Sequence, residues 1–457
     1  MNALLFSAIL GVVMMFTGIW IKKPGTVKAI AIAGAALLFV VNWMERSGIR
    51  FLNYDTSAFL SFSSFSLVFI AIMVVALLLF FMVSGDEMQK IGTSYADYFA
   101  LLFFITSGVV LLASFNNLLI LFLGIEIITI PSFILAGAEK KNLKSNEASL
   151  KYFFLGAFST GVMLMGIALL YGAQGTFDIS KMNFATHISS KLQIAGMLFL
   201  LFSMSFKASV VPFHFWAPDV YDGAPTAFTS FMATIIKSAV FIGFLKLFAN
   251  TFGDLQPVWQ LWIVLLIAAT LFVSNITAVF QQSVKRMLAY SSISHAGFML
   301  FAIYAVNETA NEGLILYVAA YCLATIGIFA VLDKLKDHSY EGFNGLARHH
   351  PTLALVGAIC LLSLAGIPLS AGFLAKFYML KAAVLTGKHL WLVIFAVLMA
   401  AVSAYYYFRV IQAMYFKEGP RQQLQLHATE KYAFIAIAVL IIVLGIFPGV
   451  LLNYLYF

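Results

Sequence analysis

Apolar runs of about 20 residues recur along the chain and are separated by short polar segments. The run VFIAIMVVALLLFFMV, residues 68–83, shows no alternation of apolar and polar positions, whereas the strands of a transmembrane barrel alternate. A helix of about 20 residues crosses the roughly 30 Å hydrocarbon core of a bilayer. The pattern therefore predicts an all-α protein that crosses a membrane many times.

The apolar runs predict about fourteen transmembrane helices, with boundaries good to about four residues. The first run has no Lys or Arg before Lys22 and is longer than the core of a signal peptide. We therefore expect it to be retained as a helix. The predicted spans are residues 2–20, 27–43, 58–84, 97–115, 117–137, 150–172, 192–213, 224–249, 258–281, 287–306, 313–332, 352–380, 389–414 and 432–454.

The positive charges of the loops predict the orientation in the membrane. An even number of crossings places both chain termini on one side, and loops rich in Lys and Arg usually lie in the cytoplasm. The loops after the odd-numbered helices carry more than twice as many of these cations as the opposite loops. Segments 139–148 and 335–350 belong to the richer set. We therefore expect them in the cytoplasm and both termini on the periplasmic side of a bacterial inner membrane.

The composition agrees with a membrane protein and argues against other classes. Of the 457 residues, 62% are hydrophobic and 10% are charged, whereas about 25% are charged in a soluble domain. The formal net charge of +8 follows mainly from the loops, and no basic stripe interleaved with aromatics indicates a nucleic-acid partner. Cys322 and Cys360 have neither a CxxC spacing nor a His partner, so we expect neither disulfides nor a metal site.

Two predicted helices contain a break at membrane depth. The seventh carries Pro212 in SVVPFHFWAP, and the twelfth carries Gly366 and Pro368 in LAGIPLSAGF. A proline inside a helix removes a backbone donor, and the polar groups that it frees need partners from protein or water. Such helices therefore line cavities in many transporters, although prolines are in general more common in membrane helices than in soluble ones.

The two breaks occupy the same place in two successive blocks of five helices. In residues 97–249 and again in 258–414, the fourth helix is broken and carries a lysine near its break. Because five is an odd number, tandem copies must cross the membrane in opposite directions, which is the inverted-repeat arrangement of many transporters. Residues 1–96 form a predicted N-terminal three-helix segment, and residues 415–457 contain the last helix.

When charges near the helix ends and His295 are set aside, four ionisable side chains of the predicted spans remain and are named the polar row: Glu126, Lys207, Lys237 and Lys376. A charge at the bilayer centre costs about 2.5–3.5 kcal/mol on insertion scales, so such groups usually pair, face water or serve transport. Glu126 and Lys207 are natural partners, because each stabilises the charged form of the other. A single buried Lys can be a snorkelling or structural cation, but the four groups together favour a proton path.

Other polar residues extend this predicted path. His295 stands among serines in AYSSISHAGF, and an imidazole that normally titrates near pH ~6.5 suits a proton relay, although a membrane histidine can equally hold helices together. His214 and Asp219 lie in and after the first break, where they are candidates for a cytoplasmic entrance, and Lys285 is a further candidate. Trp216, between them, is expected as an anchor at the membrane interface.

The sequence lacks the motifs of several cofactor sites. It contains no P-loop, no GxGxxG between a strand and a helix, no HExxH, no CxxCH and no clustered cysteines. We therefore expect no nucleotide, iron–sulfur cluster or covalent haem in this chain.

Four long segments resemble the antiporter-like proton-pumping subunits of respiratory complex I, the NADH–quinone oxidoreductase. The resemblance covers predicted helices four to thirteen. The family has three related subunit types. The adjacent type has glutamate at the position of Lys376, and the distal type continues past the position of Phe457 into a long lateral helix. These two differences favour the third type for this chain. The segments are KNLKSNEASLKYFFLGAFSTGVMLMGIALLYGAQGTFDI (141–179), FKASVVPFHFWAPDVYDGAPTAFTSFMATIIKSA (206–239), VKRMLAYSSISHAGF (284–298) and AGIPLSAGFLAKFYM (365–379).

The resemblance implies roles for residues and partners. Glu126 matches the glutamate of the family's fifth helix, Lys207 and Lys237 match its lysines in helices seven and eight, and Lys376 matches its ionisable residue in helix twelve. It further implies that NADH is oxidised and quinone reduced in partner subunits holding FMN and iron–sulfur clusters, with neighbouring antiporter-like subunits in the bilayer. A subunit of a multisubunit cation/proton antiporter is the alternative. A structural scaffold is a third, which the polar row disfavours.

Overall fold

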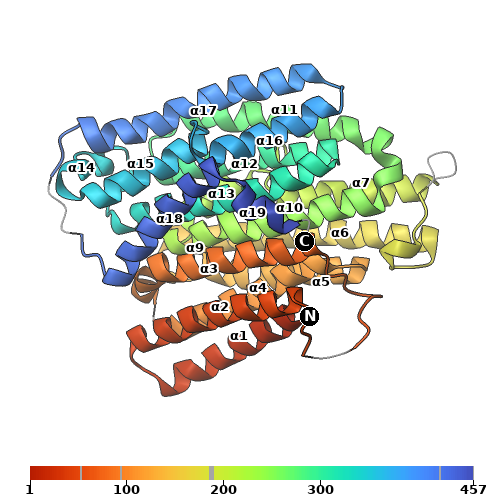
Figure 1. Cartoon of the computed structure of the whole chain (residues 1–457), viewed down its shortest axis with the longest axis horizontal. Coiled ribbons are helices and arrows are strands. Elements are labelled where there is room, and N and C mark those ends of the chain that lie inside the picture. The colour runs from red at the N-terminus through yellow and green to blue at the C-terminus, as the bar shows by residue number, and fades with distance from the viewer. Residues whose placement is uncertain (52–53, 93–94, 185–189, 421–423, 456–457) are drawn as a thin grey trace.

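A computed structural model of the chain describes residues 1–51, 54–92, 95–184, 190–420 and 424–455. Within these residues the chain is almost entirely helical, and the long helices lie side by side along one common direction (Figure 1). Twelve helical segments of the described chain are long and apolar enough to cross a membrane. Together with two broken helices they account for the predicted fourteen crossings.

The first six spans are single helices, and the seventh is broken. In chain order the spans are α1 (Asn2–Trp20), α2 (Pro24–Arg46), α3 (Ser64–Ile91), α4 (Tyr95–Ser114), α5 (Leu118–Ala136), α6 (Leu143–Gln174) and α7 (Lys191–Lys207) with α8 (Trp216–Gly223).

The eighth span is continuous but changes its helical type. It consists of α9 (Thr226–Phe231), a π-helical turn (Met232–Ile236), α10 (Lys237–Lys246) and a second π-helical turn (Leu247–Thr251). The remaining spans are α11 (Gln256–Val279), α12 (Val284–Ala305), α13 (Glu308–Lys334), α15 (Pro351–Ala365) with α16 (Ala371–Leu385), α17 (Leu390–Phe416) and α18 (Ala428–Ile446), with the short helices α14 (Leu346–His349) and α19 (Gly449–Leu452).

Both predicted breaks are present. The first separates α7 from α8, and Pro212 lies between them. The second separates α15 from α16, and Gly366 ends α15 with a φ of +83°, a left-handed conformation that glycine adopts without a steric penalty. The backbone is therefore interrupted where the prolines and the glycine predict it.

Helices α3 and α6 extend beyond the apolar runs that predict them. The last turns of α3 are polar and are held by ion pairs of 2.8 Å between Lys28 and Asp86 and between Lys334 and Glu87. Helix α6 starts at Leu143, where the Asn142 side chain accepts a hydrogen bond from the backbone N–H of Lys144. An apolar run marks only the part of a helix that lies inside the hydrocarbon. It therefore does not predict the polar turns at helix ends that are stabilised by caps or ion pairs.

The prediction that the last helix, 432–454, continues to residue 454 is wrong. Helix α18 runs from Ala428 to Ile446, and the chain turns at Phe447 before the short α19. Pro448 has no N–H to donate to a continuing helix, so the chain leaves the helical path there.

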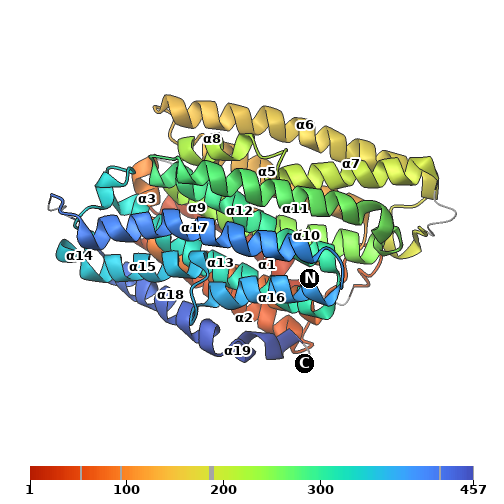
Figure 2. The same ribbon diagram turned by 90° about the horizontal axis from the view of Figure 1, so that it is seen from above.

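Helix α13 forms the centre of the bundle. Every residue of its most apolar stretch is buried within the chain, and it packs against α3, α9, α12, α15, α16 and α18. In α1, α6 and α17, by contrast, only about a third of the residues in the most apolar stretch are buried within the chain. Figure 1 shows α1 and α17 at opposite edges of the bundle, and Figure 2 shows α6 at another edge. Their apolar faces are therefore available to lipid or to partner proteins.

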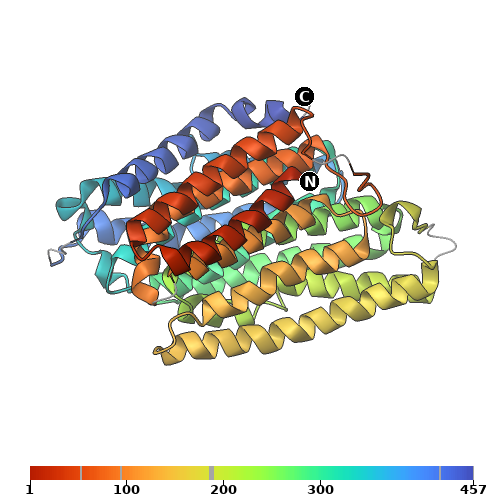
Figure 3. The ribbon, with the colours of Figure 1, turned by 90° about the horizontal axis from the view of Figure 1, so that it is seen from below.

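Both chain termini lie at the same end of the bundle, as an even number of crossings predicts (Figure 3). The amino group of Met1 contacts Glu45 near the end of α2. The neighbouring Arg46 donates from Nη2 to the carbonyl oxygen of Tyr454 at 2.5 Å. These contacts fix the two ends of the chain beside each other.

The two predicted five-helix blocks have corresponding internal neighbours. Helix α4 packs on α5 as α11 packs on α12, and α6 packs on α7 and α8 as α13 packs on α15 and α16. A repeat predicts this correspondence. The inverted relation of the blocks and their boundaries remain predictions.

The predicted orientation can be tested by cysteine labelling, because the native Cys322 and Cys360 are buried. We expect a membrane-impermeant maleimide to label Lys181→Cys in spheroplasts, and to label Lys141→Cys and Lys336→Cys only after the membrane is permeabilised. All three positions are exposed. Labelling of the last two in intact spheroplasts would show that the orientation is reversed.

Candidate functional site

Glu126 and Lys207 are linked through a threonine on a third helix. Thr160 of α6 donates from its hydroxyl to Oε1 of Glu126 on α5 at 2.8 Å. Lys207, the last residue of α7, donates from Nζ to the same hydroxyl oxygen at 3.3 Å. Glu126 and Lys207 are therefore near each other, as predicted, and the side chain of Thr160 bridges them.

Local features of α5 and α7 place this pair. Pro131 lies inside α5, five residues after Glu126, and removes one donor from the helix. Lys207 stands where α7 ends, and its Nζ also donates to the carbonyl oxygen of Gly156 at 3.4 Å. The lysine side chain is thus held against α6 and is 7% exposed.

Trp216, expected as an interfacial anchor, lies inside the bundle. It is 3% exposed, and its ring stacks on that of Tyr152 at a centroid distance of 4.7 Å. Its indole N–H donates to the carbonyl oxygen of Phe206 at 3.1 Å, next to Lys207. The interfacial prediction is therefore wrong: Trp216 instead pairs a carbonyl in the last turn of α7.

Lys237 follows the first π-helical turn and is almost completely buried. Its Nζ donates to the carbonyl oxygen of Ser292 on α12 at 3.1 Å and also contacts the Ser292 hydroxyl. It lies 5.5 Å from the ring centroid of Tyr221 on α8. A π-helical turn inside an α-helix often marks a functional site, and here it immediately precedes the lysine in the middle of the bundle.

His295 lies one turn after Ser292 on α12 and contacts two tyrosines. Its Nδ1 lies 2.6 Å from the hydroxyl of Tyr317 on α13, and its Nε2 lies 3.2 Å from the hydroxyl of Tyr407 on α17. The Tyr407 hydroxyl also contacts Ser291. The histidine therefore belongs to a hydrogen-bonded cluster that joins three helices.

Lys376 of α16 points at the end of α15. Its Nζ donates to the carbonyl oxygens of Leu364 and Ala365 at 2.9 Å and 3.0 Å. The last carbonyls of a helix lack intrahelical donors and carry partial negative charge, so the break supplies acceptors for a buried ammonium. A cavity between His295 and the second break has room for about one water molecule.

The secondary candidates at the first break make different contacts. Lys285 donates to the carbonyl oxygens of Asp222 and Ala224 at 2.8 Å and 2.6 Å, which fixes the end of α8. His214 is buried in the segment between α7 and α8, and its Nδ1 has no hydrogen-bond partner among the described residues. His214 lies within the break, as its sequence position indicates, whereas Lys285 is brought beside the break only by the packing of α12.

Asp219 joins α8 to two other helices through ion pairs. Its carboxylate lies 2.8 Å from Lys151 of α6 and 2.9 Å from Arg286 of α12. Lys151 also pairs with Glu147, as their spacing of four residues predicts.

We expect Asp219→Asn to lower stability by about 1 kcal/mol or less, because solvent screens an ion pair of this exposure. Thermal unfolding in detergent would measure the difference. Glu418→Gln, which breaks the exposed pair with Arg348, is the control. A loss of several kcal/mol for Asp219→Asn alone would show that the ion pairs do more than hold α8.

The contacts also identify residues that the sequence analysis missed. Thr160 connects Glu126 with Lys207, and Tyr317 and Tyr407 both contact His295. A hydroxyl residue in the middle of an apolar run, as in GAFSTGVM, is a signal for Thr160. The tyrosines give no comparable signal, because tyrosine is also frequent at membrane interfaces.

Comparisons with known proteins agree on one family. The family model described as "NADH:quinone oxidoreductase/Mrp antiporter, TM" matches residues 114–403. A protein from Cytophaga hutchinsonii named "NADH-quinone oxidoreductase subunit N" is 37% identical, with 99% of each chain covered. A protein of the same name from Flavobacterium psychrophilum is also 37% identical, with 100% of each chain covered.

Solved structures show the same fold. A chain of respiratory complex I from Thermus thermophilus with bound aureothin is 31% identical, with a TM-score of 0.85 and coverage of 99% of this chain and 98% of that one. A chain of the Mrp complex from Dietzia has a TM-score of 0.87 at 16% identity, with 99% and 95% covered. The second likeness concerns the fold alone.

Proposed function

This chain belongs to the subunit N family of NADH-quinone oxidoreductase, and from this premise we propose that its polar row carries protons across the membrane. Glu126, Lys207, Lys237 and Lys376 would bind and release the proton in turn, and His295 would link the last two. The electron transfer that drives the movement would take place in other subunits, which would hold FMN, iron–sulfur clusters and quinone. This chain would contribute no redox group.

The observation that carries the proposal is the set of partners of the buried lysines. Lys237 and Lys376 donate to backbone carbonyls and a hydroxyl, which are neutral acceptors. A buried lysine can lose its proton, unlike an arginine, and a neutral partner leaves no unpaired charge behind when it does so. A scaffold would gain nothing from such groups, since each costs desolvation energy.

The pair at the start of the row contains a connected set of exchangeable protons. The ammonium of Lys207 donates to Thr160, and the Thr160 hydroxyl donates to Glu126. If Thr160 passes its proton to the carboxylate and takes one from the lysine, the charge of both end groups is neutralised in one concerted step. A small change in the distance between α5 and α7 would then alter how readily the lysine holds its proton.

Proton transfer between the pair and the second block would pass through Lys237. Its contact with Ser292 leads along α12 to His295, and the cavity beside His295 leads to the helices that flank Lys376. Protons would enter from the cytoplasm and leave on the side of the two termini. The neighbouring antiporter-like subunits of the complex would contact the lipid-facing helices of this chain in the bacterial inner membrane.

Affinity purification tests the assignment against its alternative. We expect the tagged full chain to copurify with NADH dehydrogenase activity and with flavin from solubilised membranes. Isolation in a multisubunit cation/proton antiporter that lacks NADH dehydrogenase activity would favour the alternative function.

A further inference from the structure

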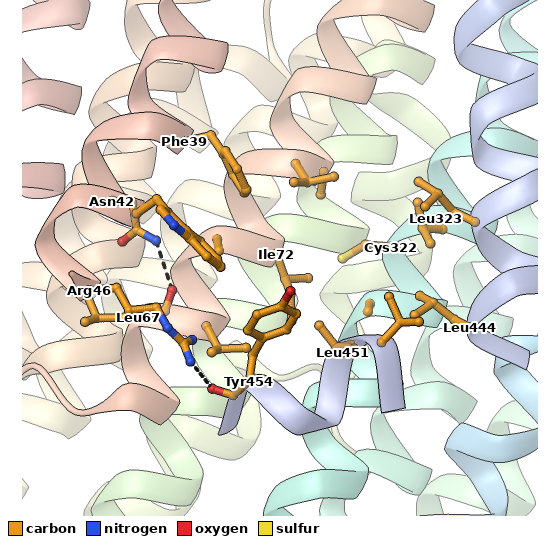
Figure 4. Close-up of a pocket in the computed structure, with 18 residues that line it drawn as sticks. Phe39, Asn42, Arg46, Leu67, Ile72, Cys322, Leu323, Leu444, Leu451 and Tyr454 are labelled. Carbon is orange, nitrogen blue, oxygen red and sulfur yellow. Dashed lines mark hydrogen bonds between the residues drawn. The ribbon is translucent and has the colours of Figure 1, made fainter. Parts of the chain in front are cut away.

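An apolar groove on the membrane-facing side of the bundle lies away from the polar row. It is bounded by α2, α3, α18 and α19, and α13 forms its floor (Figure 4). Its empty volume, with the solvent in its open mouth included, is about 940 Å³. The residues that shape it include Phe39, Ile72, Cys322, Leu323, Leu444 and Leu451.

The mouth of the groove carries a cation between two aromatic rings. The Arg46 guanidinium lies 5.5 Å from the ring centroid of Trp43 and 5.3 Å from that of Tyr454. Arg46 ends α2 on the side where the two chain termini meet. Tryptophan, tyrosine and arginine at helix ends are typical of the level of the lipid head groups. The mouth therefore lies at the membrane interface, and the groove runs from it toward the hydrocarbon core.

Arg46 is also held in place for a ligand. It donates to the carbonyl oxygen of Tyr454 at 2.5 Å, and one turn earlier Asn42 donates to the carbonyl oxygen of Leu67 at 3.0 Å, which ties α2 to α3 (Figure 4). A guanidinium has five N–H donors in a planar fork that matches the oxygens of a phosphate group. These contacts orient the side chain before any ligand binds.

We propose that this groove binds one phospholipid, with an acyl chain along the apolar walls and the phosphate group on Arg46. The cation at the mouth favours a phosphate over the neutral head group of an isoprenoid quinone. A quinone would need hydrogen-bond donors deeper in the groove, where the walls are aliphatic and aromatic side chains and the Cys322 thiol already contacts Ser238. The proposal concerns a site outside the polar row and does not depend on the proposed function.

The bound acyl chain would stabilise the packing of the central helix. Cys322 on the floor of the groove has its Sγ 3.5 Å from the hydroxyl oxygen of Ser238, the residue after Lys237. The lipid would therefore contact the face of α13 that carries Cys322, and Cys322 in turn contacts α10 through Ser238.

A photoreactive phospholipid tests the site in the purified complex. Phosphatidylglycerol with a diazirine in its acyl chain is added to the complex in detergent, and the labelled residues are mapped by mass spectrometry. We expect labelling of Ala319 and Leu323, which are 5% and 6% exposed and can be reached only from within the groove. Unlabelled phosphatidylglycerol should compete, whereas inorganic phosphate or a short-chain quinone should not.

Matched variants separate the head-group contact from the chain contact. We expect Arg46→Gln to lower labelling of α13 about tenfold at limiting probe concentration, and Ala71→Phe, which fills the groove, to abolish it. Arg50→Gln at the same end of the bundle and Val40→Phe on the outer face of α2 should leave labelling unchanged. Equal labelling in all four variants, or competition by the quinone alone, would overturn the proposal.

Discussion

NADH-driven proton uptake through this chain is expected to stop when Lys237 is replaced by alanine, while the complex still assembles. Lys237 belongs to the first block, and its ammonium contacts Ser292 of the second block. Loss of a positioned acid–base group slows proton transfer by roughly 10²–10⁴-fold, and alanine offers no exchangeable proton. Removal of a buried cation also relieves desolvation, so folding should tolerate the change.

Two further variants make this result specific. Lys237→Arg keeps the charge but cannot release its proton at physiological pH, so it should pump nearly as poorly as the alanine variant. Lys246→Ala removes a lysine from the same helix at a site outside the row and should pump normally. Uptake is followed with a pH-sensitive dye in vesicles, and assembly is followed on native gels. Normal uptake in an assembled Lys237→Ala complex would return this lysine to a structural role.

Thr160→Val is expected to lower proton uptake about tenfold. Valine has nearly the shape of threonine but no hydroxyl, so Glu126 loses a donor and Lys207 loses an acceptor. A hydrogen bond to a charged group is worth about 1.5–3 kcal/mol, and about 1.4 kcal/mol corresponds to one factor of ten in a rate. The expected change follows if transfer within this pair limits the rate.

The hydroxyl itself can be tested by restoring it. Thr160→Ser keeps the hydroxyl and should retain most of the uptake. Ser159→Ala, at the preceding position of α6, removes a hydroxyl that contacts Ser203 instead, and it should leave proton uptake unchanged. Equal uptake in Thr160→Val and the wild type would show that Glu126 and Lys207 exchange protons by another route, such as a water molecule.

The fold follows from the sequence because the bilayer imposes simple rules on it. Apolar length identifies the spans, and Pro212, Gly366 and Pro368 identify the breaks, since backbone groups without partners are costly in lipid. The exact ends are less predictable. The polar last turns of α3 depend on ion pairs with Lys28 and Lys334, which are remote in sequence.

The candidate site is predictable in part, for a related reason. A charged residue inside an apolar run is conspicuous, so Glu126 and the three lysines of the row can be selected from the sequence. Their partners depend on how the helices pack. Thr160, Tyr317 and Tyr407 become visible only when α6, α13 and α17 are brought against their neighbours, and Trp216 is misjudged because its burial depends on Tyr152 and Phe206.

The central claim is that the members of the polar row act in series on the same proton, and the number of protons moved per electron tests it most directly. The ratio is measured in sealed vesicles for Lys207→Ala, Lys376→Ala and the double variant at matched rates of NADH oxidation. If the groups act in series, either break stops the same transfer, so the three variants should share one lowered ratio. Wild-type ratios in the assembled single variants, or a further drop in the double variant, would contradict a single path through the row.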